Sequence, residues 1–447
     1  MAKVGGTAVV AGRSMGGLAA AAALAKHFER VLIIDKDELP AGPEPRLGVG
    51  QGHHVHNLLK GGELSIEKLL PGTCAELIAQ GAVPVRAGID IRISDHGQWL
   101  PKRDLGYDNI SASRPLIEHV VSQRLMRETN VEQRPATSLE DLVFSDARRV
   151  CGALLQTTGN APEPVDADLV VDCTGHLSRA KEILAAREGA TVPGFKINIG
   201  LSYTSAVFAA PRAAADGHKG VAILPSPPNK RGAFVSLIED GQWLVSLHTR
   251  FERTLPTTHE EMIAFASEIE TPDTVDFLRQ AKIQTPIRSY RKLEATWRRF
   301  DKLASLPDGF LVVGDSMTSF NPIFGQGMST AWLQAVALEN LLSARSAAQR
   351  GLDGLAHDFL PQAAQISREA WNGSTLVDSA YPEVTGDMRP GTKQAVVYLR
   401  ALRTLLADDP ELHADYIGVG QLTTPGSALM RPDRMPRVMA AMAKLPP

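Results

Sequence analysis

The apolar pattern begins with a short strand that runs into a glycine-rich turn. An apolar run at residues 7–11 leads into Gly12-Arg13-Ser14-Met15-Gly16-Gly17, and an alanine-rich helical stretch follows. A second apolar run, residues 30–34, ends at Asp35. Strand, glycine turn, helix, strand and terminal acid in this order predict a dinucleotide-binding βαβ unit.

Each position of this turn has a physical role. Gly12 permits the sharp turn, the small Ser14 lets backbone approach a pyrophosphate, and Gly17 lets the helix pack close to the strand. The helix start offers free N–H groups to phosphates, and Asp35 is placed to bond ribose hydroxyls. The alternative, an ordinary strand–helix turn, explains neither the second strand nor the acid. The predicted cofactor contacts of this unit are Gly12, Ser14, Met15, Gly16, Gly17, Asp35 and Lys36.

Further along the chain the pattern alternates between helical and extended segments. Helices are predicted at about 53–70, 115–128, 257–280 and 327–342. Buried strands are predicted at 169–175 and 309–315, and a β-rich region with a hairpin turn at Asp240-Gly241 at 195–251.

These segments predict an α/β chain whose Rossmann-like nucleotide-binding domain is assembled from distant pieces. Its expected pieces are residues 1–80, 105–190 and 300–350. Residues 81–104 and 191–299 form a β-rich substrate domain, and residues 351–447 a helical C-terminal region.

Composition narrows the class of protein. The 447 residues suffice for two or three domains, and the net charge of -3 argues against nucleic acid or an anionic membrane as partner. Three scattered cysteines and the absence of a signal peptide or of about 20 consecutive apolar residues predict a soluble cytoplasmic protein. No nucleophile-elbow pattern supports a hydrolase.

A second motif lies at residues 314–329. A buried strand ends at Gly314-Asp315, and Gly325-x-Gly327 opens a helix. Asp315 is placed to hold a polyol hydroxyl of a cofactor, with a simple turn cap as the alternative. The helix start at Gly327 offers N–H donors to a developing negative charge.

This motif, the first βαβ unit and Ser113-Arg114-Pro115-Leu116 together resemble the superfamily of FAD-dependent aromatic hydroxylases and epoxidases. The resemblance implies a glutathione reductase-type FAD-binding domain with an inserted β-sheet substrate domain. It also implies that Asp315 binds the ribityl chain, that Arg114 contacts FAD, and that Gly325, Gly327 and Met328 lie beside the flavin ring.

A narrower resemblance rests on residues 46–58 and 320–328. These stretches are similar to the branch that contains bacterial polyene epoxidases of polyether biosynthesis, a secondary metabolic pathway. The resemblance places Arg46, Gln51, His54 and His56 in the cofactor pocket. Helix capping is the alternative for the histidines. A metal site is disfavoured because no cysteine or acid cluster accompanies them.

The chain also differs from the families that it resembles at two motifs. Aromatic hydroxylases carry an Asp-Gly pair that serves both FAD and NAD(P)H, whereas this chain has Thr174-Gly175. NAD(P)H is therefore expected to supply electrons either directly or through a separate flavin reductase. The related halogenases carry a Trp-x-Trp-x-Ile-Pro motif, of which Trp99-Leu100-Pro101 is only a fragment, so halogenation is disfavoured.

The sequence thus predicts an FAD-dependent monooxygenase that epoxidises or hydroxylates a small hydrophobic alkene or aromatic compound with O2. The resemblance implies a flavin C4a-hydroperoxide as oxygen donor, and no side chain is assigned to catalysis. Two alternatives are a flavin dehydrogenase or reductase acting on C–C double bonds and a non-catalytic lipid-binding escort protein. Four aromatic residues of the β-rich region either line a substrate pocket or form plain core: Tyr203, Phe208, Phe234 and Trp243.

Overall fold

The computed structural model describes residues 3–46, 48–95, 97–146, 148–188, 191–303 and 306–445. The domain limits expected at residues 1, 190 and 447 lie outside these ranges. So does Leu47, within the stretch that resembles the polyene epoxidases.

The first sheet has five parallel strands in the order β18-β11-β1-β2-β7. The apolar runs of every strand except the polar edge strand β7 suit a parallel sheet that helices cover on both faces. The strands are β18 (Phe310–Val312), β11 (Leu169–Asp172), β1 (Gly5–Ala11), β2 (Phe28–Ile34) and β7 (Val131–Arg134). Segments far apart in the sequence therefore share one sheet, which confirms the predicted Rossmann-like α/β fold.

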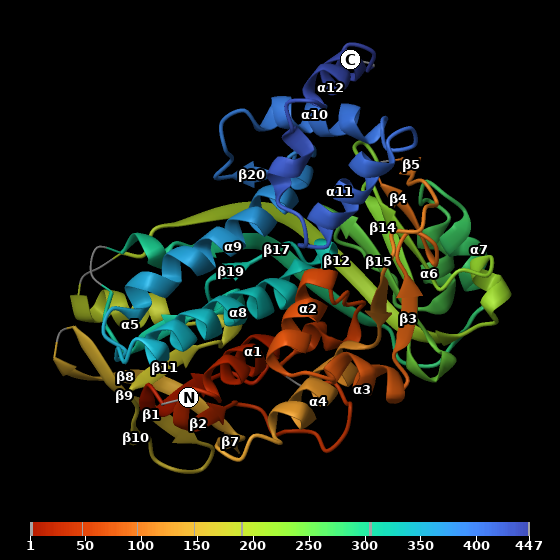
Figure 1. Cartoon of the computed structure of the whole chain (residues 1–447). Coiled ribbons are helices and arrows are strands. Elements are labelled where there is room, and N and C mark those ends of the chain that lie inside the picture. Colours follow the sequence, from red (N-terminus) through yellow and green to blue (C-terminus); the bar gives the residue numbers. More distant parts are fainter. Residues whose placement is uncertain are drawn as a thin grey trace.

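Helices pack around this sheet (Figure 1). Among them, α1 packs directly against α8, which carries the second sequence motif at its start. The helices of this part of the chain are α1 (Met15–Leu24), α2 (Lys60–Leu69), α3 (Thr73–Ala79), α4 (Arg114–Leu125), α5 (Ala180–Glu188) and α8 (Gln326–Ala347).

The second sheet has ten strands and is mainly antiparallel, with the central order β19-β17-β12-β15-β14-β13-β4-β5. Asp240 and Gly241 turn between β14 and β15 with φ values of 59° and 67°, as the hairpin prediction requires. The strands in chain order are β4 (Ile91–Asp95), β5 (Gln98–Trp99), β12 (Gly194–Ala209), β13 (Gly220–Leu224), β14 (Arg231–Leu237), β15 (Trp243–Arg250), β16 (Lys282–Ile283), β17 (Arg288–Arg298), β19 (Thr318–Ser319) and β20 (Thr385–Gly386).

Two small antiparallel sheets complete the strand inventory of the described residues. One pairs β3 (Val83–Arg86) with β6 (Asp108–Ser111). The other contains β8 (Thr137–Asp146), β9 (Arg149–Thr157) and β10 (Glu163–Asp166).

Two helix predictions need correction. The helix expected from about residue 53 begins only at Lys60, because His54 is extended and both His54 and Val55 bond to serines of the second sheet. The helix expected at 257–280 is two helices, α6 (His259–Ala266) and α7 (Asp273–Gln280). The first helix ends at the Ser267 cap, and the second begins after Pro272, which occupies its N-cap position.

The C-terminal region is helical, as expected, apart from β20, which pairs with β12. Figure 1 shows α10, α11 and α12 as a blue group on the side of the molecule away from β1 and β2. The C-terminal helices are α9 (Leu355–Asp378), α10 (Thr392–Arg403), α11 (Pro410–Gly420) and α12 (Met435–Met442). Within the described ranges, no helix has both the length and the apolar character needed to cross a membrane.

A buried ion pair joins the C-terminal region to the second sheet. Arg250 of β15 and Asp378 at the end of α9 approach to 2.7 Å, and both side chains are almost fully buried. Asn321 donates a hydrogen bond of 2.7 Å to the same carboxylate oxygen. The guanidinium also lies 4.7 Å from the centre of the Tyr381 ring. One carboxylate thus fixes strand β15, helix α9 and the loop that precedes α8.

We expect Asp378→Asn to lower the free energy of unfolding by about 3–5 kcal/mol, because it leaves the buried Arg250 charge without its partner. Urea denaturation measures this loss. The matched control is Asp276→Asn, which removes an exposed pair with Arg279 and is expected to change stability by less than about 1 kcal/mol. Equal losses in the two variants would contradict the assigned importance of the buried pair.

The predicted close approach at Gly17 is confirmed by the packing of α1. A Cβ atom at Gly17 would lie 1.7 Å from the Gly12 carbonyl oxygen, whereas one at Gly16 would meet nothing closer than 3.9 Å. Because the clash at Gly17 is with backbone, the helix must shift to relieve it.

We therefore expect Gly17→Ala to destabilise the fold by about 3 kcal/mol or more. Gly16→Ala, one position earlier, is expected to stay within about 1 kcal/mol of the parent chain, since its methyl group meets only ordinary contacts. Thermal and urea unfolding of the two variants compare them directly. A Gly17→Ala protein as stable as Gly16→Ala would refute the packing argument.

Candidate functional site

A cavity of about 530 Å³ lies at the carboxyl ends of β1, β2, β11 and β18. Ligands of open α/β sheets bind at this position. Its wall contains every predicted site residue except Gly17, which packs α1 against the turn instead. The predicted residues in the wall are Gly12, Ser14, Met15, Gly16, Asp35, Lys36, Arg46, Gln51, His54, His56, Arg114, Asp315, Gly325, Gly327 and Met328.

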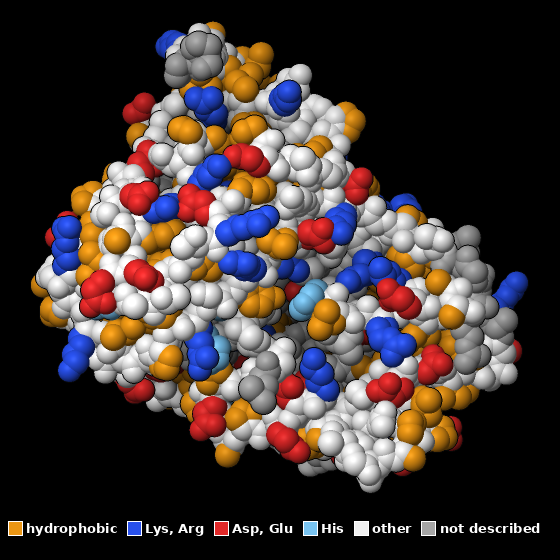
Figure 2. Space-filling view, turned by 180° about the vertical axis from the view of Figure 1, so that it is seen from behind, with side chains coloured by type: hydrophobic (Ala, Val, Ile, Leu, Met, Phe, Trp, Pro, Cys, Tyr) orange, Lys and Arg blue, Asp and Glu red, His pale blue; other side chains and the backbone are white. Residues whose placement is uncertain are grey.

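Figure 2 views the molecule from behind and shows hollows in its surface, with histidine, Lys and Arg side chains around them. The cavity wall combines basic residues with the apolar and glycine residues of the two motifs.

The glycine turn leaves the start of α1 free for a ligand. Gly12 has a φ of +95° and donates its N–H to Ile34, which reverses the chain directly after β1. Ser14 is the N-cap residue, but its side chain does not cap the helix and α1 has no acidic residue in its first turn. The Ser14 hydroxyl instead accepts a 2.7 Å hydrogen bond from Arg114. The positive end of α1 therefore meets the cavity with no acid in its own first turn, while the Glu118 carboxylate lies 3.5 Å from the Ser14 hydroxyl.

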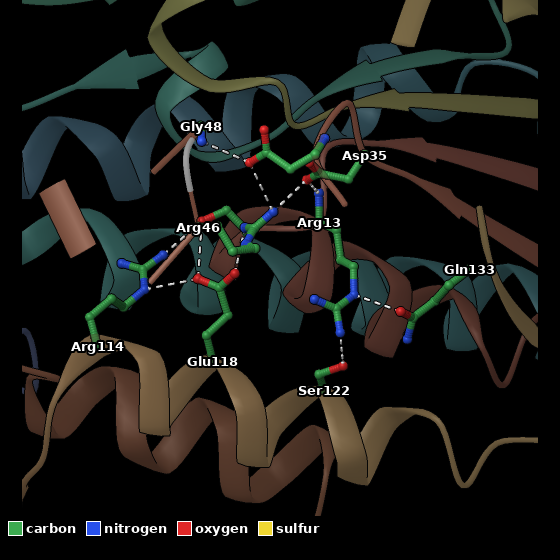
Figure 3. A network of polar contacts seen from close by, with 10 residues as sticks. Arg13, Asp35, Arg46, Gly48, Arg114, Glu118, Ser122 and Gln133 are labelled. Carbon is green, nitrogen blue, oxygen red and sulfur yellow. Dashed lines mark hydrogen bonds and ion pairs between the residues drawn. The ribbon is translucent and has the colours of Figure 1, made fainter. Parts of the chain in front are cut away.

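Arg46 lies between two buried carboxylates (Figure 3). One of its terminal nitrogens is 3.0 Å from Asp35 and the other is 2.5 Å from Glu118. Arg114 donates to the second oxygen of Glu118 at 3.1 Å. Burial lowers the pKa of Arg46, but the charges of Glu118 and Asp35 outweigh this and raise it overall.

Glu118 is the site residue that sequence reasoning missed in this network. Its spacing of four residues from Arg114 on a helix was the available signal, because residues i and i+4 share a helix face. Figure 3 also shows Arg13, whose guanidinium bonds to Gln133 and Ser122 and whose backbone N–H donates to Asp35 at 2.7 Å. The Asp35 carboxylate is thereby held at the end of β2.

Asp315 follows β18, the strand at one edge of the first sheet. Its carboxylate accepts a 3.4 Å bond from Ser319, which in turn accepts a 2.7 Å bond from Lys292 of β17. Burial lowers the pKa of Lys292, while the nearby Asp315 charge acts in the opposite direction. A Cβ atom at Gly327 would lie 3.4 Å from Asp315. The carboxylate and the start of α8 therefore share one corner of the cavity.

Thr174 is engaged with the protein itself. Its backbone N–H and its hydroxyl both donate to Asp172, at 2.8 and 2.6 Å. Ser178 and Ser316 donate to the same buried carboxylate. This network stabilises the turn after β11. The side chain at position 174 is uncharged, and its hydroxyl is occupied within the turn.

A chain of hydroxyl groups orients His54. Val55 donates its N–H to Ser246, the Ser246 and Ser205 oxygens lie 2.5 Å apart, and Ser205 lies 2.7 Å from Nδ1 of His54. Every hydroxyl proton finds an acceptor if Ser246 donates to Ser205 and Ser205 to His54. His54 then carries its proton on Nε2, which has no partner among the described residues. Burial lowers the pKa of His54 to about 3.

His248 is a second buried histidine at the cavity wall, and sequence reasoning missed it. Its ring stacks on Phe234 at a centroid distance of 5.2 Å, and neither ring nitrogen has a partner within the described part of the chain. Burial lowers its pKa to about 3. His56 is likewise held neutral, with its Nδ1 donating to the His54 carbonyl oxygen. In the ranges that the structure describes, no group of three or more His, Cys, Asp or Glu residues is arranged to hold a metal ion.

The four aromatic residues of the second sheet divide between the two interpretations. Tyr203 and Phe234 line the cavity. Phe208 and Trp243 are fully buried in the core between the sheet and α6 and α7. Two of the four residues therefore belong to the core, and two lie at the cavity wall.

Comparison with solved structures shows where else this fold occurs. A flavoprotein/dehydrogenase from Cytophaga hutchinsonii superposes with a TM-score of 0.69 at 14% identity, over 99% of this chain and 100% of that one. The flavin-dependent brominase Bmp2 gives 0.65 at 14% identity over 99% of both chains. The p-nitrophenol 4-monooxygenase PnpA from Pseudomonas putida DLL-E4 gives 0.62 at 15% identity, over 95% of this chain and 99% of that one. At such identities the likeness shows a shared fold.

No protein-family model matches the chain. Among curated proteins, protein Rv3254 of Mycobacterium tuberculosis is 31% identical over 401 residues, which cover 86% of this chain and 82% of that protein. An identity of this size over most of both chains shows common descent. The chain belongs to the same protein family as Rv3254 of Mycobacterium tuberculosis.

Proposed function

We propose that this protein is an FAD-dependent monooxygenase that transfers one oxygen atom from O2 to a small hydrophobic alkene or aromatic compound, by epoxidation or hydroxylation. One observation carries the proposal. A single cavity joins the glycine turn and Asp315, which suit a flavin dinucleotide, to an aromatic wall of the second sheet that suits an apolar substrate. The fold shared with the monooxygenase PnpA supports the same class.

The residues of the cavity fit FAD. A Cβ atom at Gly12 would lie 2.4 Å from the Cys173 carbonyl oxygen, so the turn is as narrow as a backbone cradle for pyrophosphate requires. We assign the pyrophosphate to this turn and to the start of α1, the ribose to Asp35, and the ribityl chain to Asp315. The expected further contacts are Lys36, Arg46, Gln51, His54, His56 and Arg114. When bound, the flavin supplies the redox chemistry with O2.

The start of α8 has the geometry to stabilise negative charge beside the flavin ring. Gly325 has a φ of +65° and precedes a 22-residue helix with no acidic residue in its first turn. The free N–H groups of Gly327 and Met328 then face the cavity as donors. Transfer of an electrophilic oxygen to a π-system needs no side-chain base, and we assign none. The protein's part is to position the substrate and exclude water.

We propose NAD(P)H as the source of electrons, directly or through a separate flavin reductase. Thr174 provides no charge where the aromatic hydroxylases carry an acid, and its hydroxyl is occupied by Asp172. Anaerobic addition of NADH or NADPH alone distinguishes the two routes, since only direct transfer bleaches the bound flavin.

We also propose that the protein is related to the polyene epoxidases of secondary metabolism. This proposal rests on the resemblance of residues 46–58 and 320–328 to that branch. We also propose the division into an FAD domain (1–80, 105–190 and 300–350), a substrate domain (81–104 and 191–299) and a C-terminal region (351–447). The two sheets support this division, because β1, β2, β7, β11 and β18 fall in the first unit and most strands of the second sheet in the second.

A flavin dehydrogenase or reductase acting on C–C double bonds is the second candidate. The observation in its favour is the TM-score of 0.69 with the flavoprotein/dehydrogenase of Cytophaga hutchinsonii. A dehydrogenase incorporates no oxygen, so the origin of the product's oxygen separates the two candidates.

We expect the purified protein to be yellow and Asp315→Ala to weaken flavin retention at least tenfold, since it removes a charged hydrogen-bonding partner worth about 1.5–3 kcal/mol. Visible absorbance and flavin released on denaturation measure the loss. Asp353→Ala serves as control, because Asp353 is exposed and lies outside the cavity wall. A well-folded parent chain without flavin, expressed with ample riboflavin, would disprove the assignment.

With ¹⁸O2, reduced flavin and an accepted substrate, we expect one labelled oxygen atom in each product molecule. The reason is that the proposed reaction takes its oxygen from O2 and not from water. Mass spectrometry of the product checks this, with unlabelled O2 in labelled water as the reciprocal experiment. A product whose label comes from water, or one formed without oxygen uptake, would favour another reaction class.

A further inference from the structure

A second cavity of about 370 Å³ adjoins the first. Asn57 and Phe234 line both cavities, so the two meet at these side chains. The volume falls within the range of about 300–1,000 Å³ that is typical of small-molecule sites. None of the predicted cofactor residues lines it. The second cavity is therefore space beyond the assigned cofactor contacts.

The wall of the second cavity is mainly apolar. It is formed by β3, β4, β6, β13 and β14 and, on the opposite side, by α11 of the C-terminal region. The apolar residues at this wall include Leu58, Leu59, Ile93, Ala222, Phe234 and Ile417. The wall also contains Arg86, Arg92 and Lys102, of which Arg86 and Arg92 are ion-paired with aspartates. The apolar part of the wall suits hydrocarbon.

Helix α11 is fixed as a wall by polar contacts with the N-terminal part of the chain. Gln421, directly after α11, accepts hydrogen bonds from the Lys60 N–H at 2.8 Å and from the Asn109 side chain at 3.2 Å. Arg103 donates to the Leu406 and Ala407 carbonyl oxygens just before the helix. Helix α11 of the C-terminal region thus forms one wall of the second cavity.

Phe234 lies at the boundary between the two cavities, where it lines both together with Asn57. Its strand neighbours Ala233 and Val235 are buried, whereas Phe234 is partly exposed and stacks on His248. Because alternate residues of a strand point to opposite faces, Phe234 presents its ring on the face of the His248 ring. A ligand that occupies both cavities must lie along this ring.

We propose that the second cavity holds the apolar tail of the substrate, whose reacting end lies in the first cavity. The substrate is then an extended molecule with an alkyl or alkenyl tail, longer than a single aromatic ring. This inference rests on the proposed function for the reacting end only, because binding of the tail requires no flavin chemistry.

The test measures binding of phenol, 4-butylphenol and 4-octylphenol to the purified protein by equilibrium dialysis. Each methylene buried in the second cavity strengthens binding by about fourfold. Allowing for incomplete burial, we expect 4-octylphenol to bind at least about thirtyfold more tightly than phenol. Ala222 lines the second cavity but not the first and is partly exposed, so Ala222→Trp places the added ring in the second cavity.

We expect Ala222→Trp to weaken binding of 4-octylphenol at least about tenfold and to leave phenol within about twofold. Ala213→Trp, an exposed position outside both cavities, is the matched control and is expected to bind like the parent chain. Ile417→Trp fills the same cavity from α11 and replaces Ala222→Trp if that variant does not fold.

Affinity that does not rise with tail length, or parent-like binding of 4-octylphenol by both cavity-filling variants, would overturn the inference. These outcomes are separable from failure of the proposed function. A protein that binds flavin and incorporates labelled oxygen but shows no dependence on tail length refutes the second cavity alone. A protein that binds the octyl tail but no flavin refutes the proposed reaction alone.

Discussion

The guanidinium of Arg46, buried between Asp35 and Glu118, is the interaction on which the cofactor cavity depends. Arg46 belongs to the loop between β2 and α2, and its guanidinium joins this loop to Asp35 at the end of β2 and to Glu118 of helix α4. Burying these charges is costly, and the arrangement is stable only because the cation has a carboxylate at each end of its fork. Arg114 and Ser14 extend the network to the start of α1. Three segments distant in sequence are thereby brought to the cavity in one geometry.

Local patterns predicted the parts of this site that short stretches of chain determine. The turn at Gly12 and the strand end at Asp315 were recognisable because a glycine with positive φ and an acid after an apolar run each leave a signature of a few residues. Glu118 left only its spacing from Arg114 as a signal, and Lys292 and His248 left none, since the contacts that define their roles come from other segments of the chain. Arg46 is 72 residues from Glu118, and Ser319 is 27 residues from Lys292. The helix expected from residue 53 failed for the same reason, because His54 and Val55 bond to serines of β12 and β15 instead of continuing a helix.

The second sheet shows what periodicity alone cannot decide. Tyr203 and Phe208 lie five positions apart on β12, so they point to opposite faces, one to the cavity and the other to the core. Their partners across the ladder, His248 and Trp243, divide in the same way. The sequence shows that two sets of side chains alternate. Only the packing of α6 and α7 on one face establishes which set is core.

The discontinuous parallel sheet also determines when the cavity comes into existence. Strand β18 completes the sheet only after residue 310, and the buried contact of Asn321 with Asp378 requires the chain as far as the end of α9. Pairing between β11 and β18 closes a loop of more than 100 residues that contains most of the second sheet. Contacts of such separation form late in folding. During synthesis, therefore, the turn at Gly12 emerges first but has no complete pocket until most of the polypeptide has left the ribosome, so a dinucleotide finds its full set of contacts only after α9 has been made.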